Sequence, residues 1–579
     1  TCLVGSEMCI RDRLVSDRGK YKGPGTGMFL LNTRNGEMHS FENVKSFTFS
    51  NNSRWLVFHH HDKKAKEKEA EKQNATLPAG STLTLMDLEN KRSDTLAFVS
   101  NFAMDSVSQH LAYVVADTAA TGNGIYAMTL SNPSSPSTVL YADSSAWAGE
   151  LEWNNQTGEL AFLAGITGEK GKKEKSTLYL WSPGETEAEI ALADQDLQDE
   201  WRIWHTNKLQ WSKDGLRLFL GTKPVSEILV PEVEKADSLK NLYSLEDILA
   251  DRGVDVWHWD DPYINSHQKK MWKDEKNRTY TGVYYPEDNR FVQLADTKMP
   301  DIRISENSHT LLGSSRVPYA KLVTWDGRYS DYYLVDLATG KREQLITANQ
   351  GRPSLSPDGK FLSWYEEGNW YLLDASTNES RNLTGKLDVP FADEDWDYPE
   401  DTPGYGVAGW LDMSEAVMIY DKYDIWKFPL EEGDPVCLTE GKGRAGKLQF
   451  RIRQLDREKQ FLEKGEYLLL SAYHDLEKYT AFYTMKAGRA GVSPLVEEAK
   501  KYSFLAKAKE ADMLLYTRQS YTEFPDLWVA DLKFKKPRKL SDLNAQTREI
   551  AWGEAELVEW SSLDRTAMQG ILIKPGNYK

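Results

Sequence analysis

A hairpin-bearing unit that recurs along the chain constrains the fold more than any other feature of the sequence. Its clearest copy is Tyr332–Trp364, where an apolar strand ends at Asp336, turns through Thr339-Gly340-Lys341 and resumes at Leu345. A second turn, Ser356-Pro357-Asp358-Gly359-Lys360, separates two more apolar stretches. Pro, Asp and Gly are typical of tight turns, so the unit predicts two successive β-hairpins, with its Asp residues in turn and strand-end roles and not catalytic ones.

About ten copies of this unit can be followed along the chain. The first hairpin of the unit is matched at Phe29–Phe41, Leu83–Leu96, Ile125–Leu140, Leu178–Ile190, Val283–Leu294, Tyr332–Leu345, Trp370–Leu383, Ile425–Leu438, Phe482–Leu495 and Leu527–Leu540. The second follows all but the last, at Phe49–Phe58, Met104–Val115, Leu151–Leu163, Leu209–Leu220, Ile302–Leu312, Leu355–Trp364, Ala408–Tyr420, Glu466–Ser471 and Phe504–Tyr516. Most neighbouring units are about 40–60 residues apart, the length of four short antiparallel strands, which predicts an all-β propeller of WD40-like blades. An irregular stack of β-sandwiches is the alternative.

The ten units exceed the roughly 4–8 blades of an ordinary ring, so the chain forms either one large ring or two propellers. The pattern breaks between Thr222 and Val283, where Val225–Arg252 has helical periodicity with Ser244 as a potential N-cap. We therefore expect a first set of blades at 14–224, incomplete at its N-terminal side, a short helical insertion or junction at 225–256, and a second set at 257–555. Two propellers fit this pattern slightly better than one oversized ring. The charge-rich segment Asp62–Gln73 is expected to be a solvated loop or exposed helix.

Both ends of the sequence depart from the repeat. Thr1–Arg13 has no repeat character and reads as a non-native, adapter-derived segment, so we leave it out of the fold prediction. Residues 556–579 end in the strand Gly570–Pro575 and a turn at Gly576-Asn577, which we expect to be the truncated start of another domain.

The composition narrows the function classes. The chain has 88 acidic and 71 basic residues, a net charge of −17, which argues against nucleic acid as its main partner. Its three cysteines, Cys2, Cys9 and Cys437, give neither a disulfide framework nor a zinc spacing. No apolar run approaches the ~18 residues of a membrane span, and no signal peptide is visible in the sequence.

Four clusters could carry chemistry, and for each one an ordinary structural role is the favoured interpretation. Gly441–Lys447 matches most of a phosphate-binding loop, but Leu448 stands where a magnesium-binding Ser or Thr is needed. His59 and His61 could share one face of a strand near a metal, yet a solvated strand end is favoured. Asp393–Asp401 offers oxygen ligands without the spacing of a calcium loop, so a solvated loop is favoured. The acidic pairs Glu366-Glu367 and Glu431-Glu432 lie beside Gly in expected hairpin turns.

No catalytic, cofactor-binding or metal-binding residue is therefore assigned from the sequence. The G-x-S-x-G motif, which exposes a nucleophilic serine above an α/β-hydrolase sheet, occurs nowhere in the chain. The alternating strand and helix pattern of that fold is absent from the sequence as well.

Several stretches nevertheless resemble the end of the propeller in the prolyl oligopeptidase family of serine peptidases. They are Tyr521–Val529, Lys539–Asn544 and Glu556–Pro575, and the segments Val254–Pro262 and Tyr420–Lys427 are similar to parts of large bacterial members of the Bacteroidetes type. The resemblance covers nearly all of Lys22–Lys579. One departure is Asp564-Arg565, where Asp-Gly is common in the family, and it puts the geometry of one turn in doubt.

The resemblance implies a serine peptidase whose Ser, Asp and His triad lies beyond Lys579, in a domain to which the propeller limits peptide access. It also implies a periplasmic or secreted location. No counterpart of the paired glutamates by which dipeptidyl peptidases hold an N-terminus is found, so exopeptidase action is not supported. Two alternatives stay open. One is a stand-alone propeller that binds proteins or glycans, and the other is a glycosidase-like enzyme with paired acids from different blades in the central channel.

Overall fold

The computed structural model describes the chain apart from residues 1, 5–6, 14–25, 33–36, 62–79, 118–121, 134, 144–145, 168–172, 199, 229–257, 307–308, 413, 432, 457, 510 and 579. Strands are the main regular structure of the described part, and within each sheet most of them pair antiparallel with the next strand along the chain. Turn residues with positive φ, such as Gly340 (+71°) and Gly359 (+74°), connect neighbouring strands, as the repeat predicts.

The first half of the chain forms five four-stranded units. The first unit has the strands β1 (Cys2–Val4), β2 (Glu7–Arg13), β3 (Thr26–Asn32) and β4 (Met38–Phe41). The next two units are joined into one seven-stranded sheet by the long strand β8, and its strands are β5 (Val44–Phe49), β6 (Trp55–His60), β7 (Ser81–Asp87), β8 (Arg92–Met104), β9 (His110–Val115), β10 (Gly124–Thr129) and β11 (Thr138–Ala142). The fourth has β12 (Ala146–Trp153), β13 (Leu160–Thr167), β14 (Lys173–Trp181) and β15 (Glu189–Leu192). The fifth has β16 (Trp201–Ile203), β17 (Gln210–Trp211), β18 (Leu218–Pro224), β19 (Tyr280–Tyr285) and β20 (Arg290–Gln293).

The second half repeats the same four-stranded pattern five times. The sixth unit has β21 (Asp301–Arg303), β22 (Thr310–Ser315), β23 (Ser330–Asp336) and β24 (Arg342–Asn349). The seventh has β25 (Ser354–Leu355), β26 (Phe361–Glu366), β27 (Asn369–Asp374) and β28 (Glu379–Asn382). The eighth has β29 (Val407–Leu411), β30 (Ala416–Tyr420), β31 (Ile425–Pro429) and β32 (Val436–Cys437). The ninth and tenth have β33 (Leu448–Arg453), β34 (Tyr467–His474), β35 (Thr480–Lys486), β36 (Val492–Val496), β37 (Lys501–Lys507), β38 (Met513–Gln519), β39 (Asp526–Asp531) and β40 (Arg538–Lys539).

Helices are few and short in the described residues. They are α2 (Val225–Ile228), α4 (Asn265–Glu275), α5 (Lys442–Gly446) and the 3-10 turns η2 (Asp194–Asp196), η3 (Val317–Thr324) and η4 (Ala545–Glu549). The all-β propeller predicted from about ten repeats is therefore confirmed. Each predicted first hairpin forms the third and fourth strands of one unit, and each second hairpin contributes to the first two strands of the next unit.

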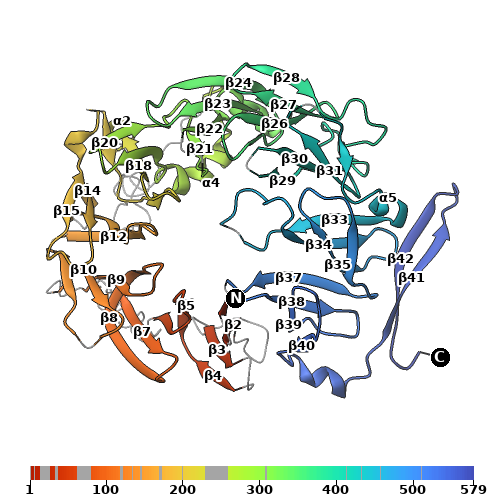
Figure 1. Cartoon of the computed structure of the whole chain (residues 1–579), viewed down its shortest axis with the longest axis horizontal. Helices are drawn as coiled ribbons and strands as arrows, with labels where there is room; N and C mark the ends of the chain where they lie inside the picture. The colour runs from red at the N-terminus through yellow and green to blue at the C-terminus, as the bar shows by residue number, and fades with distance from the viewer. Residues whose placement is uncertain are drawn as a thin grey trace, which may run out of the picture.

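Ten hydrophobic clusters of described residues lie between successive units and hold the ring together. One of them joins the fifth and sixth units through Phe219, Val283 and Leu311, all almost fully buried. Another brings Leu31 of the first unit against Leu515 and Val529 of the tenth, which closes the circle. Figure 1 shows the units following one another around a single open ring. Since a four-stranded unit has two faces to bury, packing each unit on two neighbours stabilises all of them.

The interruption after Thr222 lies inside one unit. Strand β18 pairs directly with β19, for example Phe219 with Val283, so residues from both sides of 225–256 belong to one sheet. This is the arrangement of an insertion and not of a junction, and the expected pair of propellers is corrected to one ring. Helical structure is described at α2 and α4, while 229–257, including the proposed N-cap Ser244, and the charge-rich segment at 62–73 lie outside the described residues.

The segment set aside at residues 1–13 contributes two strands to the first unit. Strand β2 pairs with β3 over seven residue pairs, from Glu7 with Asn32 to Arg13 with Thr26. The register of this pairing continues through β4. The segment therefore takes part in the sheet, which its lack of repeat character did not predict.

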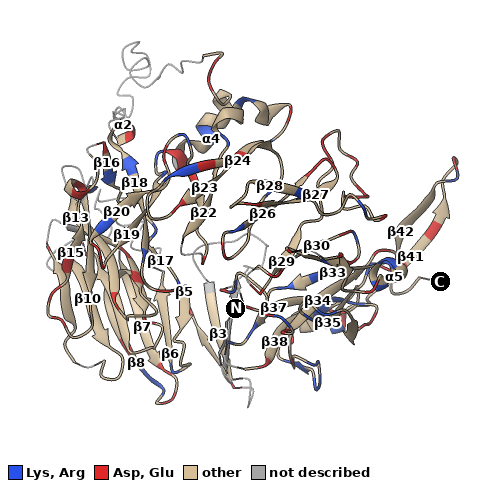
Figure 2. Cartoon of the chain, turned by 45° about the horizontal axis from the view of Figure 1, so that its top comes forward, with Lys and Arg blue, Asp and Glu red and all other residues tan. Residues whose placement is uncertain are grey.

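A two-stranded hairpin follows the tenth unit and projects from the ring (Figures 1 and 2). It consists of β41 (Glu554–Ser561) and β42 (Ala567–Lys574), which pair only with each other. Ile571 is 72% exposed and Ile573 58%. At its turn Arg565 has a φ of +69°, the left-handed conformation that glycine favours, so the turn that Asp564-Arg565 put in doubt is formed.

Candidate functional site

The four clusters considered from the sequence have structural roles. In Gly441–Lys447, the N–H groups of Gly443 and Arg444 both donate to the buried carboxylate of Asp424, each at 2.9 Å. The hydroxyl of Thr439 donates to the same carboxylate at 2.6 Å. Because a side chain of the protein already occupies these donors, the loop does not present them to a phosphate.

The acidic run Asp393–Asp401 is partly held by cations of the eighth and ninth units. Lys422 Nζ lies 2.7 Å from Asp395 Oδ1, and Arg444 lies 2.8 Å from Glu394 Oε1. Lys422 is buried, which by itself would lower its pKa, but the hydrogen bond to Asp395 and the nearby groups Tyr423 and Asp475 together raise that pKa above the ordinary range. Most of the run is exposed, as expected of a solvated connecting loop, and these two ion pairs fix it to the ring.

His59 is buried, which corrects the expectation of a solvated strand end. It is only 4% exposed, and its Nε2 lies 2.7 Å from the carbonyl oxygen of Val99 and 2.9 Å from Ser81 Oγ. Because a carbonyl only accepts, Nε2 carries the proton, and this nitrogen cannot act as a base toward Ser81. The contact between Ser81 and His59 is therefore structural.

The acidic pairs occupy hairpin turns, as expected. Glu366 ends β26 and accepts a hydrogen bond from Trp364 Nε1 at 3.2 Å, while Glu367 has a φ of +44° at the turn. Glu431 lies in the turn after β31, and Glu432 lies outside the described residues.

Two further groups carry parts of a catalytic arrangement and lack the rest. His110 Nδ1 lies 3.0 Å from Asp105 Oδ2, as in a triad, but its ring contacts Trp153 and Trp181 and no nucleophile is described beside it. Cys437 is half-buried, and burial raises the pKa of its thiol, which disfavours the reactive thiolate. In the described part of the chain, no three His, Cys, Asp or Glu side chains are grouped as a metal site.

The feature that sequence reasoning missed is a long loop between the first two strands of the ninth unit. Gln454–Glu466 connects β33 to β34, and Figure 1 shows its described part, which leaves out residue 457, extending into the open centre of the ring. The corresponding connection in the seventh unit, between β25 and β26, is only five residues long, Ser356–Lys360. We name Gln454–Glu466 the crossing loop. Its length and charge were visible in the sequence, but its direction was not.

The base of the crossing loop is fixed to the eighth unit by backbone hydrogen bonds. Leu462 N–H donates to the carbonyl of Trp410 at 2.8 Å, and Asp412 N–H donates to the carbonyl of Leu462 at 2.9 Å. Leu462 also packs on Gly409, where a Cβ would lie 3.1 Å from the leucine side chain. This close contact explains the glycine at position 409 and indicates a firm base.

The tip of the loop reaches units on the opposite side of the ring through polar contacts. Lys213, in the turn between β17 and β18, forms an ion pair with Glu306 and donates a hydrogen bond to the carbonyl of Glu458. Glu306 N–H donates to Gln460 Oε1 at 2.8 Å. On the tenth unit, Lys509 lies 3.3 Å from Glu458. Glu458 and Lys509 are both strongly exposed, so solvent and salt weaken their attraction.

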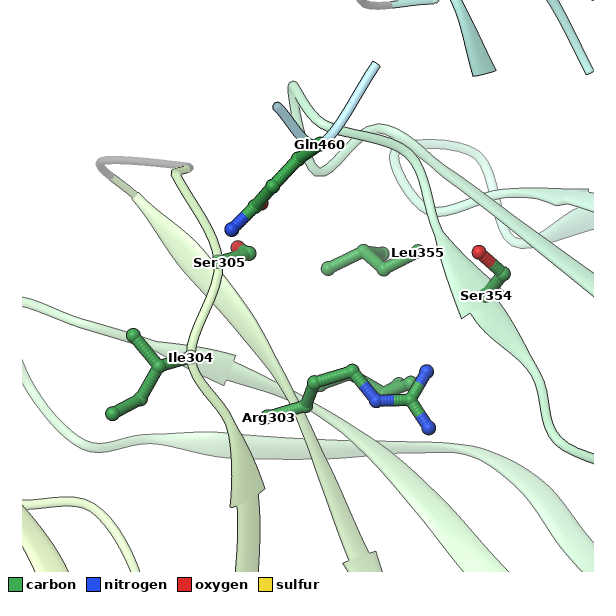
Figure 3. Close-up of a pocket in the computed structure, with 7 residues that line it drawn as sticks. Arg303, Ile304, Ser305, Ser354, Leu355 and Gln460 are labelled. Atoms are coloured by element: carbon green, nitrogen blue, oxygen red, sulfur yellow. The ribbon is translucent and has the colours of Figure 1, made fainter. Parts of the chain in front are cut away.

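A cavity of about 200 Å³ lies beside this tip, between the sixth and seventh units (Figure 3). Its polar walls come from Arg303, Ser305, Ser354 and the crossing-loop residue Gln460. Ligand pockets usually have about 300–1,000 Å³, so this cavity is too small to be a complete site for peptide cleavage.

Among the described helices, none is long and apolar enough to cross a membrane.

Comparisons with known proteins find similarity to solved structures but none at the level of sequence. No protein-family model matches the chain, and no curated protein shows significant sequence similarity to it. A structure from a study of two prolyl endopeptidases matches with a TM-score of 0.35 and 12% identity, over 75% of this chain and 55% of the other. An acylaminoacyl peptidase matches with a TM-score of 0.30 and 13% identity, over 74% of this chain and 58% of the peptidase. The propeller domain of the Trilobed protease from Pyrococcus furiosus matches with a TM-score of 0.30 and 8% identity, over 94% of this chain and 96% of that domain.

The chain thus spans little more than half the length of the first two matched peptidases. At these TM-scores the likeness does not distinguish functions, and a eukaryotic initiation factor reaches the same 0.35 as the prolyl endopeptidase.

Proposed function

We propose that this chain is the propeller region of a serine peptidase of the prolyl oligopeptidase type, and that the ring limits which peptides reach an α/β-hydrolase domain. The observation that carries the proposal is the exposed hairpin β41–β42, which extends from the last unit and contains the stretch Glu556–Pro575 that resembles the entry to such a domain. A two-stranded hairpin is marginally stable by itself, so its apolar side chains favour a covering domain.

The crossing loop supplies a means of limiting access. It lies across the centre of the ring, where a peptide passing along the ring axis would meet it. Its base is bonded to the backbone of the eighth unit, whereas its tip is held by an exposed ion pair with Lys509 and by hydrogen bonds with Lys213 and Glu306. The tip can therefore leave its contacts without disturbing the base.

A fluorophosphonate probe tests the peptidase assignment, because it labels activated serine nucleophiles. We expect the complete gene product to be labelled and residues 1–579 alone to remain unlabelled. Labelling of residues 1–579, or no labelling of the complete product, contradicts the proposal. In the second case a stand-alone binding propeller becomes the better explanation.

The access role needs a separate activity measurement on the complete gene product that has not been treated with the probe. Replacement of Gln454–Glu466 by a short turn is expected to raise kcat/KM for long peptides more than for dipeptide-like substrates. Equal effects on both substrate lengths would contradict a role in access. We also propose a periplasmic or secreted location, which cell fractionation of the native host tests directly.

A further inference from the structure

The cavity beside the crossing loop has one cationic side chain and no acidic one. Its lining consists of Arg303, three polar side chains and the aliphatic side chains of Ile304, Leu312 and Leu355. An electropositive cavity of this kind favours a ligand that carries a negative charge.

Arg303 is the residue that would meet such a ligand. Its Nη1 donates to the carbonyl of Pro353 at 2.9 Å, which orients the guanidinium and leaves its other N–H groups for a ligand. In Figure 3 the side chain extends toward Ser354 and below Leu355. Among the ion pairs of the described residues, none involves Arg303.

The polar groups around Arg303 are held in place by residues of four units, the sixth to the ninth. Ser354 Oγ accepts a hydrogen bond from Trp410 Nε1 at 2.9 Å, so its own hydroxyl proton is directed elsewhere. Gln460 accepts from the backbone of Glu306 through Oε1, which fixes its amide nitrogen as the remaining donor. Figure 3 shows that nitrogen close to Ser305. A hydroxyl and an amide donor thus join one guanidinium around a small space.

We propose that this cavity binds a carboxylate attached to a short aliphatic group, with Arg303 as its anchor. A single cation matches one negative charge, whereas a phosphate dianion would need more positive charge than the lining provides. Ile304, Leu312 and Leu355 offer an apolar wall for the aliphatic part. The cavity volume fits one small residue, so either the C-terminal residue of a peptide or a free short-chain acid could supply this chemistry.

The identification of the ligand with a peptide C-terminus rests on the proposed peptidase function, whereas carboxylate binding does not. If the ligand is a peptide end, the cavity would hold it where the crossing loop meets the sixth unit. Gln460 forms part of the wall, so an occupied cavity would also keep the tip of the loop in place.

Saturation-transfer NMR on residues 1–579 tests the proposal with N-acetyl-alanine, N-acetyl-alanine amide and acetate as probes. Because Arg303 is exposed, we expect N-acetyl-alanine to bind with a Kd on the order of 1 mM, and the uncharged amide to bind at least about tenfold more weakly. Arg303→Gln should weaken N-acetyl-alanine binding by about tenfold or more. Arg303→Lys, which keeps the charge without the planar fork, should weaken it less.

Arg538→Gln is the matched control, because Arg538 is an exposed arginine on β40 and the substitution changes the net charge equally. It should leave binding unchanged. Acetate that binds as tightly as N-acetyl-alanine would support the carboxylate site and contradict the peptide end as its ligand. Equal binding of the amide, or unchanged binding by Arg303→Gln with an unchanged melting temperature, overturns the carboxylate site itself, whatever the probe labelling of the complete gene product shows.

Discussion

Replacement of Lys213 by alanine should release the tip of the crossing loop while the base stays in place. The lysine makes two contacts there, an ion pair with Glu306 and a hydrogen bond to the carbonyl of Glu458. The ion pair joins the fifth unit to the sixth and does not involve the loop, whereas the hydrogen bond to Glu458 contributes about 0.5–1.5 kcal/mol to holding the tip. Its loss should therefore raise the open fraction of the tip about 2- to 12-fold.

Hydrogen–deuterium exchange measured by mass spectrometry reports this opening directly. In Lys213→Ala, peptides covering 454–460 should exchange about 2- to 12-fold faster, while the amide of Leu462, bonded to Trp410, should keep its rate. At about 1 M salt, where the Debye length is ~3 Å, the unmodified protein should approach the variant. Lys360→Ala, which removes an exposed lysine from the turn before β26, is the control.

Two results would refute this reasoning. Unchanged exchange at the tip would mean that other contacts hold it. Equal acceleration at the tip and at Leu462 would mean that the whole loop detaches as one body, so that tip and base are not separate.

Three further outcomes follow from the charged groups of the ring. Asp424→Asn should lower the free energy of unfolding by about 2–3 kcal/mol in urea titrations, because an amide nitrogen would then face the N–H of Arg444 or Gly443. An unchanged urea midpoint would contradict the capping role of the carboxylate. Burial alone would raise the pKa of Asp87, but hydrogen bonds from Arg54, Asn90 and nearby backbone N–H groups lower it to about 2. The ionised carboxylate therefore stabilises the fold fully above pH ~4, and this stabilisation is lost as the pH falls from there toward 2. Asp87→Asn should reduce this pH dependence of the free energy of unfolding. Burial raises the pKa of Glu152 to about 7, so the ionised side chain opposes folding at pH 8, and Glu152→Gln should raise the melting temperature at pH 8 and change it little at pH 4.

The blades could be predicted from the sequence because their turns are local. The glycines at 340 and 359 adopt the positive φ that tight turns require, and each lies within a few residues of the strands it connects. All ten repeats found in this way correspond to paired strands. A turn of this kind depends only on residues close in sequence, so it is predicted correctly even when the arrangement of the units is not.

The number of rings could not be predicted because it depends on contacts between distant residues. The closing cluster joins Leu31 to Leu515, and the insertion between β18 and β19 is recognised only from their pairing. A break in periodicity looks the same whether it lies within a sheet or between domains.

The candidate site was missed for the same reason. Gln460 meets the backbone of Glu306 from 154 residues away, and Lys213 meets Glu458 from 245 residues away. His59 shows the opposite error. A polar residue at the end of a strand was expected to be solvated, whereas its side chain is buried against Ser81 of β7 and Val99 of β8. Pattern alone does not show which strand ends are covered.

The closing contact between the first and tenth units has a mechanical consequence. Among the described strands, no backbone pairing joins β1–β4 to β37–β40, and the apolar cluster around Leu31 closes the circle through side chains. The chain itself connects every other pair of neighbouring units, so this joint can separate without stretching the backbone or breaking a strand pair. The circumference of the ring is therefore adjustable at one defined place, and a bulky object pressing outward from the centre would open the molecule between β3 and β38.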